Sequence, residues 1–420
     1  MELDATKLAG KVICLVTSGN VGSNPRIVKE ADALHAAGAT VHVIAMSAPQ
    51  LLHVQQRDDA VVDGAAWAST RVATGGQVGR YARAALNRIA LLGFKLGLNV
   101  TPVILWAYNP RIGDLSRVAC ATPADMYIAH NLAALPAAWQ AAQRYQARLG
   151  FDAEDFHSGE LTDIPENELK RALICTLERR YLPDCDYLTA AAPGIARAYA
   201  KAYALKEPSV ILNVFPRAEA PGYVTAKGTS LQNASLYWFS QTIGPDRGLE
   251  TVVKAIALSA SRPALYLRGS LVNGYKEKLE ALAHQHGISK HLFFLAPAKP
   301  TEMARLAAQY DVGIASEVDT TLNRDICLTN KIFTYLLAGI PILASSTTAQ
   351  VEIANDLNNA MWCYHQNDSQ SLAVLIDKLL CSDEGLAQAR LNAFSHGQKK
   401  FNWDIESIKF IEIIQNLIRN

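Results

Sequence analysis

The sequence predicts an α/β protein built from two doubly wound parallel sheets. Two observations carry this prediction: short β-rich apolar runs alternate with segments of helical periodicity, and the alternation restarts near residue 209. The chain has 420 residues, 50% of them hydrophobic and 19% charged, which is enough for two or three domains with sizeable cores. We expect a first domain at 1–207, a second at 208–397 and a final helix at 398–420.

The first half opens with a β-loop-α-β unit. An apolar run at 11–17 is followed by a turn-rich loop at 18–25, a helical segment at 26–37 and a second strand at 41–45. This order implies a right-handed crossover onto a parallel sheet. Later strands are expected at 124–130 and 186–190, with helices at 132–148 and 193–206.

The second half repeats the pattern after a strand at 209–213 and a polar stretch at 217–234, which is the best linker candidate. Strands are expected at 235–240, 264–268, 291–295, 311–315 and 340–344, with helices between them. Ligands of such open sheets bind at the carboxyl ends of the strands. The cleft between the two halves is therefore the expected site.

Charge and cysteine usage exclude several classes. Forty basic and 39 acidic side chains leave a formal net charge of +1, so we expect no nucleic-acid partner. Seven cysteines without a CxxC pair argue against a disulfide framework and a zinc knuckle, and they favour a reducing cytoplasm. The polar start and the lack of a long apolar run predict neither a signal peptide nor a spanning helix.

The segment Asn330 to Ser345, NKIFTYLLAGIPILAS, resembles the signature of retaining glycosyltransferases with two Rossmann-like domains, the GT-B fold of the family 4 kind. Shorter stretches agree with that family in order and spacing, at 24–26, 129–131, 152–157, 213–216, 246–250 and 401–403. The resemblance covers nearly the whole chain. It implies two Rossmann-like domains facing across a cleft, with the C-terminal helix crossing back to the first domain.

The same resemblance implies an activity. Such enzymes move a sugar, with retention, from a nucleotide-sugar donor to a glycan or lipid-linked acceptor, as in surface polysaccharide or lipopolysaccharide synthesis. The donor binds the C-terminal domain and the acceptor the N-terminal domain. No metal or other cofactor is expected, because helix N-termini and basic side chains neutralise the leaving diphosphate.

Two basic side chains are predicted to act on that diphosphate. Arg247 lies in a strand-to-helix turn, where a guanidinium clamps phosphate in a bidentate manner. Lys331 starts the predicted helix 331–338, where its charge opposes the helix dipole unless an anion is present. The alternatives are a solvated turn arginine and a surface lysine.

Further donor contacts are predicted around the strand ends. Glu317 follows the strand at 311–315 and is placed to meet sugar hydroxyls, and Asn330 is the expected helix cap. Thr334 stands where the family commonly has a glutamate that holds the donor ribose; its hydroxyl is shorter and uncharged. The remaining donor-binding predictions are the loop glycines Gly19, Gly22, Gly244 and Gly269.

The first half supplies the other predicted site residues. His130 ends a strand, and by resemblance it touches the donor sugar as a catalytic residue. Glu154, Asp155 and His157 lie in one loop and are predicted to orient an acceptor hydroxyl. The alternatives are a histidine satisfied by backbone groups beside a helix cap, and a charged loop that is simply solvated.

Residues 80–95 form a basic amphipathic stretch with Arg80, Arg83, Arg88 and Lys95. This pattern suits peripheral attachment to an anionic membrane on the cytoplasmic side, but an ordinary surface helix, which has the same pattern, is the favoured interpretation. Three alternatives to glycosyl transfer stay open: a non-catalytic GT-B-like binding or partner subunit, a sugar-nucleotide epimerase, and a dinucleotide-dependent oxidoreductase. The missing Gly-x-Gly-x-x-Gly fingerprint argues against the oxidoreductase.

Overall fold

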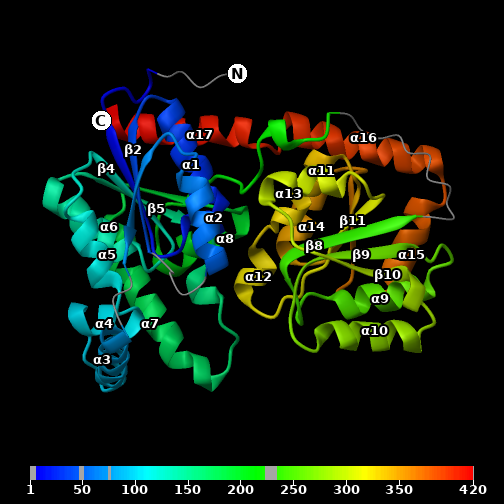
Figure 1. Cartoon of the computed structure of the whole chain (residues 1–420), viewed down its shortest axis with the longest axis horizontal. Coiled ribbons are helices and arrows are strands. Elements are labelled where there is room, and N and C mark those ends of the chain that lie inside the picture. The colour runs from blue at the N-terminus through cyan, green and yellow to red at the C-terminus, as the bar shows by residue number, and fades with distance from the viewer. Residues whose placement is uncertain (1–5, 47–51, 74–76, 223–233, 420) are drawn as a thin grey trace. The chain divides into compact units, whose positions relative to one another are not determined.

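The computed structural model describes residues 6–46, 52–73, 77–222 and 234–419, which form two parallel sheets flanked by helices (Figure 1). The chain divides into two compact units. The first comprises Met1–Ile211 and Ser407–Asn420, and the second comprises Leu212–Glu406. The predicted α/β class with two doubly wound domains is confirmed. No helix in the described ranges is long and apolar enough to cross a membrane.

The first unit contains a seven-stranded sheet in the order β3-β2-β1-β4-β5-β6-β7, and all its strand pairs are parallel. The register places Thr17 opposite His130, and His130 opposite Asp152, so three polar residues meet at the carboxyl edge of the central strands. The strands are β1 (Val12–Thr17), β2 (Thr40–Met46), β3 (Ala68–Val72), β4 (Met126–His130), β5 (Arg148–Ala153), β6 (Tyr187–Ala190) and β7 (Ser209–Val210).

Helix α1 (Pro25–Ala36) follows β1 and starts at a well-defined cap. The Asn24 side chain accepts hydrogen bonds from the backbone N–H groups of Arg26 and Ile27, and Pro25 occupies the first turn. The other helices of this unit are α2 (Leu52–Val62), α3 (Gln77–Lys95), α4 (Thr101–Tyr108), α5 (Ile112–Ala119), α6 (Leu135–Tyr145), α7 (Pro165–Tyr181) and α8 (Pro193–Tyr203).

Strand β5 corrects the predicted helix at 132–148. Helix α6 ends at Tyr145 because Gln146 adopts a left-handed conformation, with φ of 51°, and β5 begins at Arg148. The strand contains Gly150, where a Cβ would lie 2.1 Å from the Tyr187 ring, so only glycine fits this buried position. A short strand with an internal glycine carries a weak sequence signal.

The second unit contains a six-stranded parallel sheet in the order β10-β9-β8-β11-β12-β13. Its strands are β8 (Ser235–Ile243), β9 (Ala264–Leu271), β10 (Leu292–Leu295), β11 (Val312–Ala315), β12 (Ile342–Ser345) and β13 (Met361–Tyr364). Its helices are α9 (Leu249–Leu258), α10 (Tyr275–Gln285), α11 (Met303–Ala307), α12 (Leu322–Ile326), α13 (Asn330–Ala338), α14 (Thr348–Asp356), α15 (Ser369–Leu380) and α16 (Asp383–Lys399). The apolar side chains of β8, α9 and α15 form one core.

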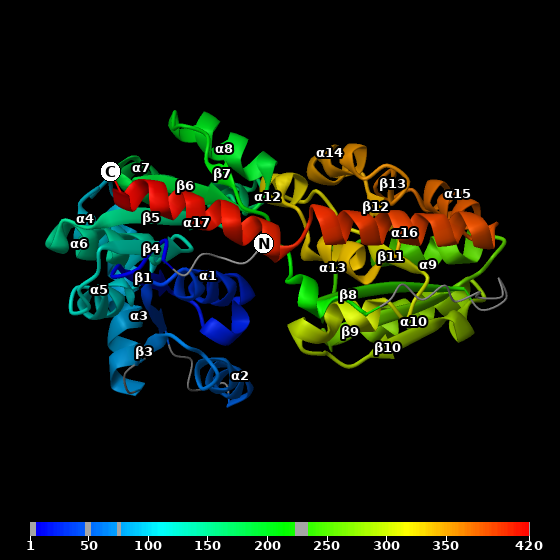
Figure 2. The ribbon, with the colours of Figure 1, turned by 90° about the horizontal axis from the view of Figure 1, so that it is seen from above.

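Two segments lie where the units adjoin along the chain. Of the predicted linker at 217–234, residues 217–222 belong to the second unit, and 223–233 lie outside the described residues. Helix α17 (Trp403–Arg419) follows α16, as Figure 2 shows. The second unit ends at Glu406 and the first resumes at Ser407, so the helix contributes to both units.

Candidate functional site

A carboxylate stands at the carboxyl edge of the second unit's sheet. Glu317 follows β11, and the side chain of Ser345 at the end of β12 fixes its backbone: the Glu317 N–H donates to the Ser345 hydroxyl at 2.8 Å, which donates to the Glu317 carbonyl at 2.7 Å. The Gln350 side chain in α14 donates to the same hydroxyl at 3.1 Å. The two strand ends are therefore held in one rigid arrangement.

Three cations surround this carboxylate, and together the four side chains form the Glu317 cluster. The Lys331 ammonium lies 2.5 Å from Glu317 Oε1, while Arg247 and Arg324 approach Oε2 at 3.6 and 3.7 Å. Burial alone would raise the pKa of the Glu317 carboxyl, but the three cations hold it below its ordinary value. Three positive charges against one negative leave a surplus of two.

The surplus positive charge of the Glu317 cluster lies where electrostatic attraction for an anion is strong. Lys331 lies in the first turn of α13, so the helix dipole adds positive potential. The lysine side chain is only 6% exposed, whereas those of Arg247 and Arg324 are 27% and 30% exposed. The ammonium also sits 5.2 Å from the Trp238 ring centroid. A ligand with two phosphate groups would reach the arginines from solvent and be compensated by the cluster.

The start of α13 differs from the prediction in one respect. Thr329, not Asn330, is the N-cap, and its side chain accepts from the Lys331 N–H; Asn330 is the first helical residue. Thr334 lies one turn further on and is 1% exposed, and its hydroxyl has no hydrogen-bond partner among the described residues. A buried hydroxyl without a partner costs free energy, and the role of Thr334 in donor binding remains a prediction.

Asp325, another carboxylate near this edge, is already engaged. Its two oxygens accept from the Thr348 N–H at 2.8 Å and the Thr348 hydroxyl at 2.6 Å. Glu317 is therefore the carboxylate of this edge whose surroundings favour a ligand role.

Steric contacts explain why glycine is needed near the ends of β8 and β9. A Cβ on Gly269 would lie 2.6 Å from the Ser240 carbonyl, and one on Gly244 would lie 2.9 Å from the Val272 side chain. Gly248 has φ of 67° and closes on Ser316, which brings the Arg247 loop against the end of β11. Donor contacts of Gly244 and Gly269 remain predictions.

The first unit holds a second ionic group, the His130 cluster, made of Arg26, Glu30, His130, Asp152 and Glu154. Arg26 donates to both oxygens of Asp152, at 2.5 and 2.7 Å, and to the Ile211 carbonyl at 2.7 Å. His130 Nε2 lies 3.1 Å from Glu30, and its Nδ1 lies 3.4 Å from both Asp152 and Glu154. All but Glu154 are fully buried, and the Glu154 side chain is 25% exposed.

Charge within this cluster is largely compensated. Burial opposes a charge on His130, but Glu30, Glu154 and Asp152 raise its pKa to about 10, so the ring is protonated at neutral pH. Burial, together with Asp152, raises the pKa of Glu30. Although burial acts the other way, Arg26 lowers the pKa of Asp152. Two cations therefore face three carboxylates, one of which holds a proton more readily than usual.

A metal fits this cluster poorly. The potential ligand atoms of Glu30, His130 and Asp152 lie within 4.8 Å of one another. No other group of three His, Cys, Asp or Glu residues comes as close together in the described part of the chain. Arg26 already occupies both oxygens of Asp152 and would repel a divalent cation. We assign no metal to it.

The predicted acceptor residues fall into two environments. Glu154 joins the His130 cluster and accepts from the Asn24 side chain at 2.6 Å. His157 is 8% exposed and contacts Glu160 at 3.3 Å. The Tyr199 hydroxyl donates to the Asp155 carbonyl. The loop therefore presents Glu154 alone of these three to the buried ionic group.

The predicted loop glycines after β1 are tied to neighbours. The Gly19 N–H donates to the Thr17 hydroxyl at 3.1 Å, and the Gly22 N–H donates to Asp58 at 2.6 Å. The Gly22 amide is thus occupied, and a ligand contact there would have to displace a buried carboxylate.

Sequence reasoning missed Arg324, Arg26, Glu30 and the role of Asp152. Arg324 belongs to the five-residue helix α12, whose Thr321 cap is the one local signal that could have placed it. Arg26 and Glu30 are four apart on the buried face of α1, where two opposite charges among apolar residues signal a buried ion pair.

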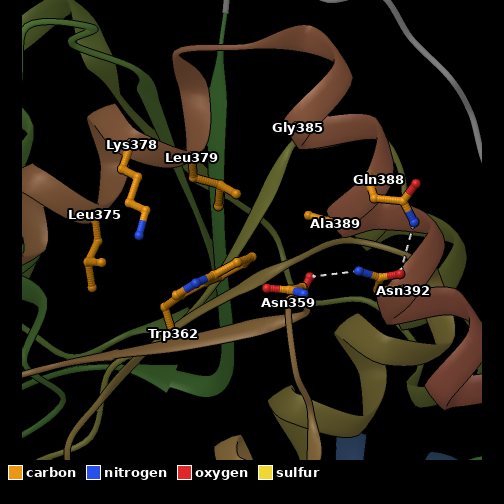
Figure 3. A pocket seen from close by; sticks show the side chains of 9 residues that line it. All are labelled: Asn359, Trp362, Leu375, Lys378, Leu379, Gly385, Gln388, Ala389 and Asn392. Atoms are coloured by element: carbon orange, nitrogen blue, oxygen red, sulfur yellow. Dashed lines mark hydrogen bonds between the residues drawn. The ribbon is translucent and has the colours of Figure 1, made fainter.

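A separate cavity of about 250 Å3 lies between β13, α15 and α16 in the second unit (Figure 3). The Trp362 ring, Leu375 and Leu379 line it, with Lys378, Gln388 and Asn392 around them. None of the predicted site residues lines this cavity.

The two sheets place this chain among proteins of the GT-B fold. HepE from Anabaena, solved with UDP and with UDP-glucose, is 16% identical, with a TM-score of 0.68 over 97% of this chain and 100% of that chain. Sucrose-phosphate synthase from Thermosynechococcus elongatus is 12% identical, with a TM-score of 0.68 over 97% and 99% of the two chains.

A glycosyltransferase from Rickettsia africae is 13% identical, with a TM-score of 0.66 over 98% of this chain and 99% of that chain. No protein-family model and no curated protein matches this sequence. At these identities the likeness establishes the fold alone.

Proposed function

We propose that this protein is a glycosyltransferase that moves a sugar from a nucleotide-sugar donor to a glycan or lipid-linked acceptor, with retention of anomeric configuration. The observation that carries the proposal is the Glu317 cluster, in which three cations surround one carboxylate at the carboxyl edge of a parallel sheet. The GT-B fold supports it, because HepE shares that fold and was solved with UDP-glucose.

The cluster suits the chemistry of transfer. The bond between the anomeric carbon and the diphosphate oxygen breaks while a bond to the acceptor hydroxyl oxygen forms, and the hydroxyl proton passes to an oxygen of the leaving diphosphate. Negative charge grows on the leaving diphosphate, where Arg247, Lys331 and the N-terminal amides of α13 stabilise it. Arg324 adds a third cation to this role. The chain's own cations supply this stabilisation, so chelation by EDTA should leave activity unchanged.

The test is incubation of the purified protein with a panel of nucleotide sugars, with and without glycan acceptors. Release of free nucleoside diphosphate that Arg247→Ala abolishes supports the proposal. Lys254→Ala removes an exposed cation from α9 of the same unit and serves as the matched control. A new sugar-nucleotide epimer would identify an epimerase instead, and a reduced or oxidised dinucleotide would identify an oxidoreductase.

A non-catalytic binding subunit is the second candidate, and it is favoured by Thr334, which stands where the family that the sequence resembles commonly has a glutamate. A threonine in place of a charged ribose acceptor should weaken nucleotide binding by ~1.5–3 kcal/mol. Calorimetry with UDP distinguishes the cases. Binding by the wild type supports a working donor site, whereas binding that appears only in Thr334→Glu supports a degenerate one.

A cytoplasmic location belongs to the same proposal, because cytoplasmic nucleotide sugars would be the donors and none of the seven cysteines, each within the described residues, forms a disulfide.

A further inference from the structure

An acid-free segment separates Asp63 from Asp114. The intervening 50 residues contain no aspartate or glutamate, but they contain six cations: Arg71, Arg80, Arg83, Arg88, Lys95 and Arg111. The whole chain is almost neutral, with 40 basic and 39 acidic side chains. Positive charge is therefore concentrated locally on an otherwise balanced protein.

Exposed apolar side chains concentrate in the same segment. Sixteen large hydrophobic residues are exposed in the described parts of the chain, and seven of them lie between positions 81 and 100. That interval is fewer than one residue in twenty of the chain. The seven are Tyr81 (77% exposed), Leu86, Ile89 (66%), Leu92, Leu96 (74%), Leu98 and Val100.

These side chains share a face with free cations. Tyr81, Ile89 and Leu92 are spaced by eight and three residues in α3, which puts them on one side of the helix. Arg88 and Lys95, seven apart, flank that side; both are exposed and make no ion pair with any described residue. The opposite side of α3 packs on α4, and Figure 1 shows the two helices next to each other.

A basic pocket adjoins this face. Arg80, Arg83 and Asn87 of α3, together with Tyr108 and Arg111, line a cavity of about 390 Å3. Arg83 is held 3.0 Å from Asp114, and Arg111 donates to the Val72 carbonyl at 3.0 Å, so both guanidiniums are fixed. Arg80 is exposed and makes no ion pair within the described ranges. Three arginines around one hollow suit a phosphate group.

We propose that the α3–α4 surface, residues 80–111, docks on a bilayer that contains anionic phospholipid. The cations meet lipid phosphates, with one headgroup in the arginine pocket, and the Tyr81–Ile89–Leu92 row enters the acyl boundary. Charge complementarity selects this occupant, because a basic face with exposed apolar side chains matches an anionic lipid surface. The inference does not depend on the proposed function, since binding is measured without a donor.

The experiment is flotation of the full chain with vesicles of phosphatidylcholine alone and of phosphatidylcholine with phosphatidylglycerol, at low and high salt. The charge variant is Arg88→Glu with Lys95→Glu, and the apolar variant is Ile89→Ser with Leu92→Ser. Lys254→Glu with Lys290→Glu is the matched control, because it removes two exposed cations from the other unit with the same change in net charge. All changes are on exposed side chains, and circular dichroism verifies folding.

We expect the wild type and the control to float with anionic vesicles at low salt and to dissociate at high salt. The charge variant should lose about tenfold or more in partition, and the apolar variant should also bind more weakly. Failure of the wild type to float, or equal flotation of wild type and charge variant, overturns the proposal. The proposal is also overturned, in favour of self-association, if the wild type does not bind vesicles but forms a dimer that the apolar variant does not form.

Discussion

The two ionic clusters use the same residue types in opposite ways. In the His130 cluster, carboxylates outnumber cations, and four of the five side chains are fully buried. Arg26 donates hydrogen bonds to Asp152 and to a backbone carbonyl. In the Glu317 cluster, cations outnumber the carboxylate three to one, and two of them are more than a quarter exposed. The charges of the first cluster largely compensate one another, whereas the second cluster carries surplus positive charge.

We propose that this difference separates a structural role from a binding role. A buried group of mutually compensating charges holds elements together, here α1, β4 and β5. Its loss should therefore lower the free energy of unfolding. Substitutions in a group with surplus charge at an accessible strand edge should instead change ligand affinity and reaction rate. Variants in each cluster should therefore fail in different assays.

The largest effect is expected for Arg26→Met. It would leave Glu30, Asp152 and Glu154 facing only the His130 charge in a buried site, so the free energy of unfolding should fall by ~3–5 kcal/mol. Urea unfolding provides the measurement. Arg71→Met is the control, because its pair with Asp59 is partly exposed and should contribute at most ~1 kcal/mol. A loss below 1 kcal/mol for Arg26→Met would contradict the structural role.

Arg247→Ala and Lys331→Ala should each lower kcat/KM on a nucleotide-sugar donor by ~10²–10³-fold, because each removes ~2.7–4 kcal/mol of stabilisation from developing diphosphate charge. Arg247→Ala should melt like the wild type, since its side chain is partly exposed. Lys331→Ala should also lower the melting temperature, because it strips Glu317 of its closest cation. Steady-state kinetics and thermal melts test both. Activity within threefold of wild type for both variants would remove this site assignment.

The pH dependence of stability should differ between wild type and His130→Gln. The raised pKa of His130, about 10, means that its charge stabilises the fold fully below the ordinary pKa near 6.5. That contribution declines as pH rises and is lost through pH 10, with a slope of at most ~1.4 kcal/mol per pH unit. Unfolding of both proteins at several pH values measures it. A difference between them that stays constant from pH 6 to pH 10 would show that the ring is not charged.

The smallest effect is expected for Thr334→Val, which keeps the shape of the side chain and removes the unpartnered hydroxyl. The free energy of unfolding should rise by ~1 kcal/mol, because a buried unsatisfied group is lost. If the hydroxyl serves the ligand, affinity for UDP should fall by about two- to tenfold at the same time. Calorimetry and urea unfolding separate the two effects. Unchanged affinity for UDP would show that the Thr334 hydroxyl does not bind the ligand.

The sequence was informative where local signals agree with tertiary structure. Apolar runs predicted β8, β9 and β11, and the ends of strands and the start of a helix predicted Arg247, Glu317 and Lys331 as donor-site residues. Their mutual ion pairs were not predicted. Arg324 was missed because its approach to Glu317 depends on where the short helix α12 settles. The burial of His130 was missed because its partner Glu30 lies about 100 residues earlier, in α1, and reaches it only once α1 has packed beside the sheet.

The shared helix α17 has a consequence for synthesis on the ribosome. Phe410, Ile411 and Ile414 are fully buried and belong to the first unit, so that unit lacks part of its interior until these residues have been synthesised. The whole second unit, Leu212–Glu406, is made in between, which takes roughly 10–40 s at typical rates of elongation. During that interval the nascent first unit carries an unfilled apolar groove. Chaperone dependence should therefore persist until Ser407 and the residues after it are made, and termination of translation before Phe410 should leave the first unit incomplete.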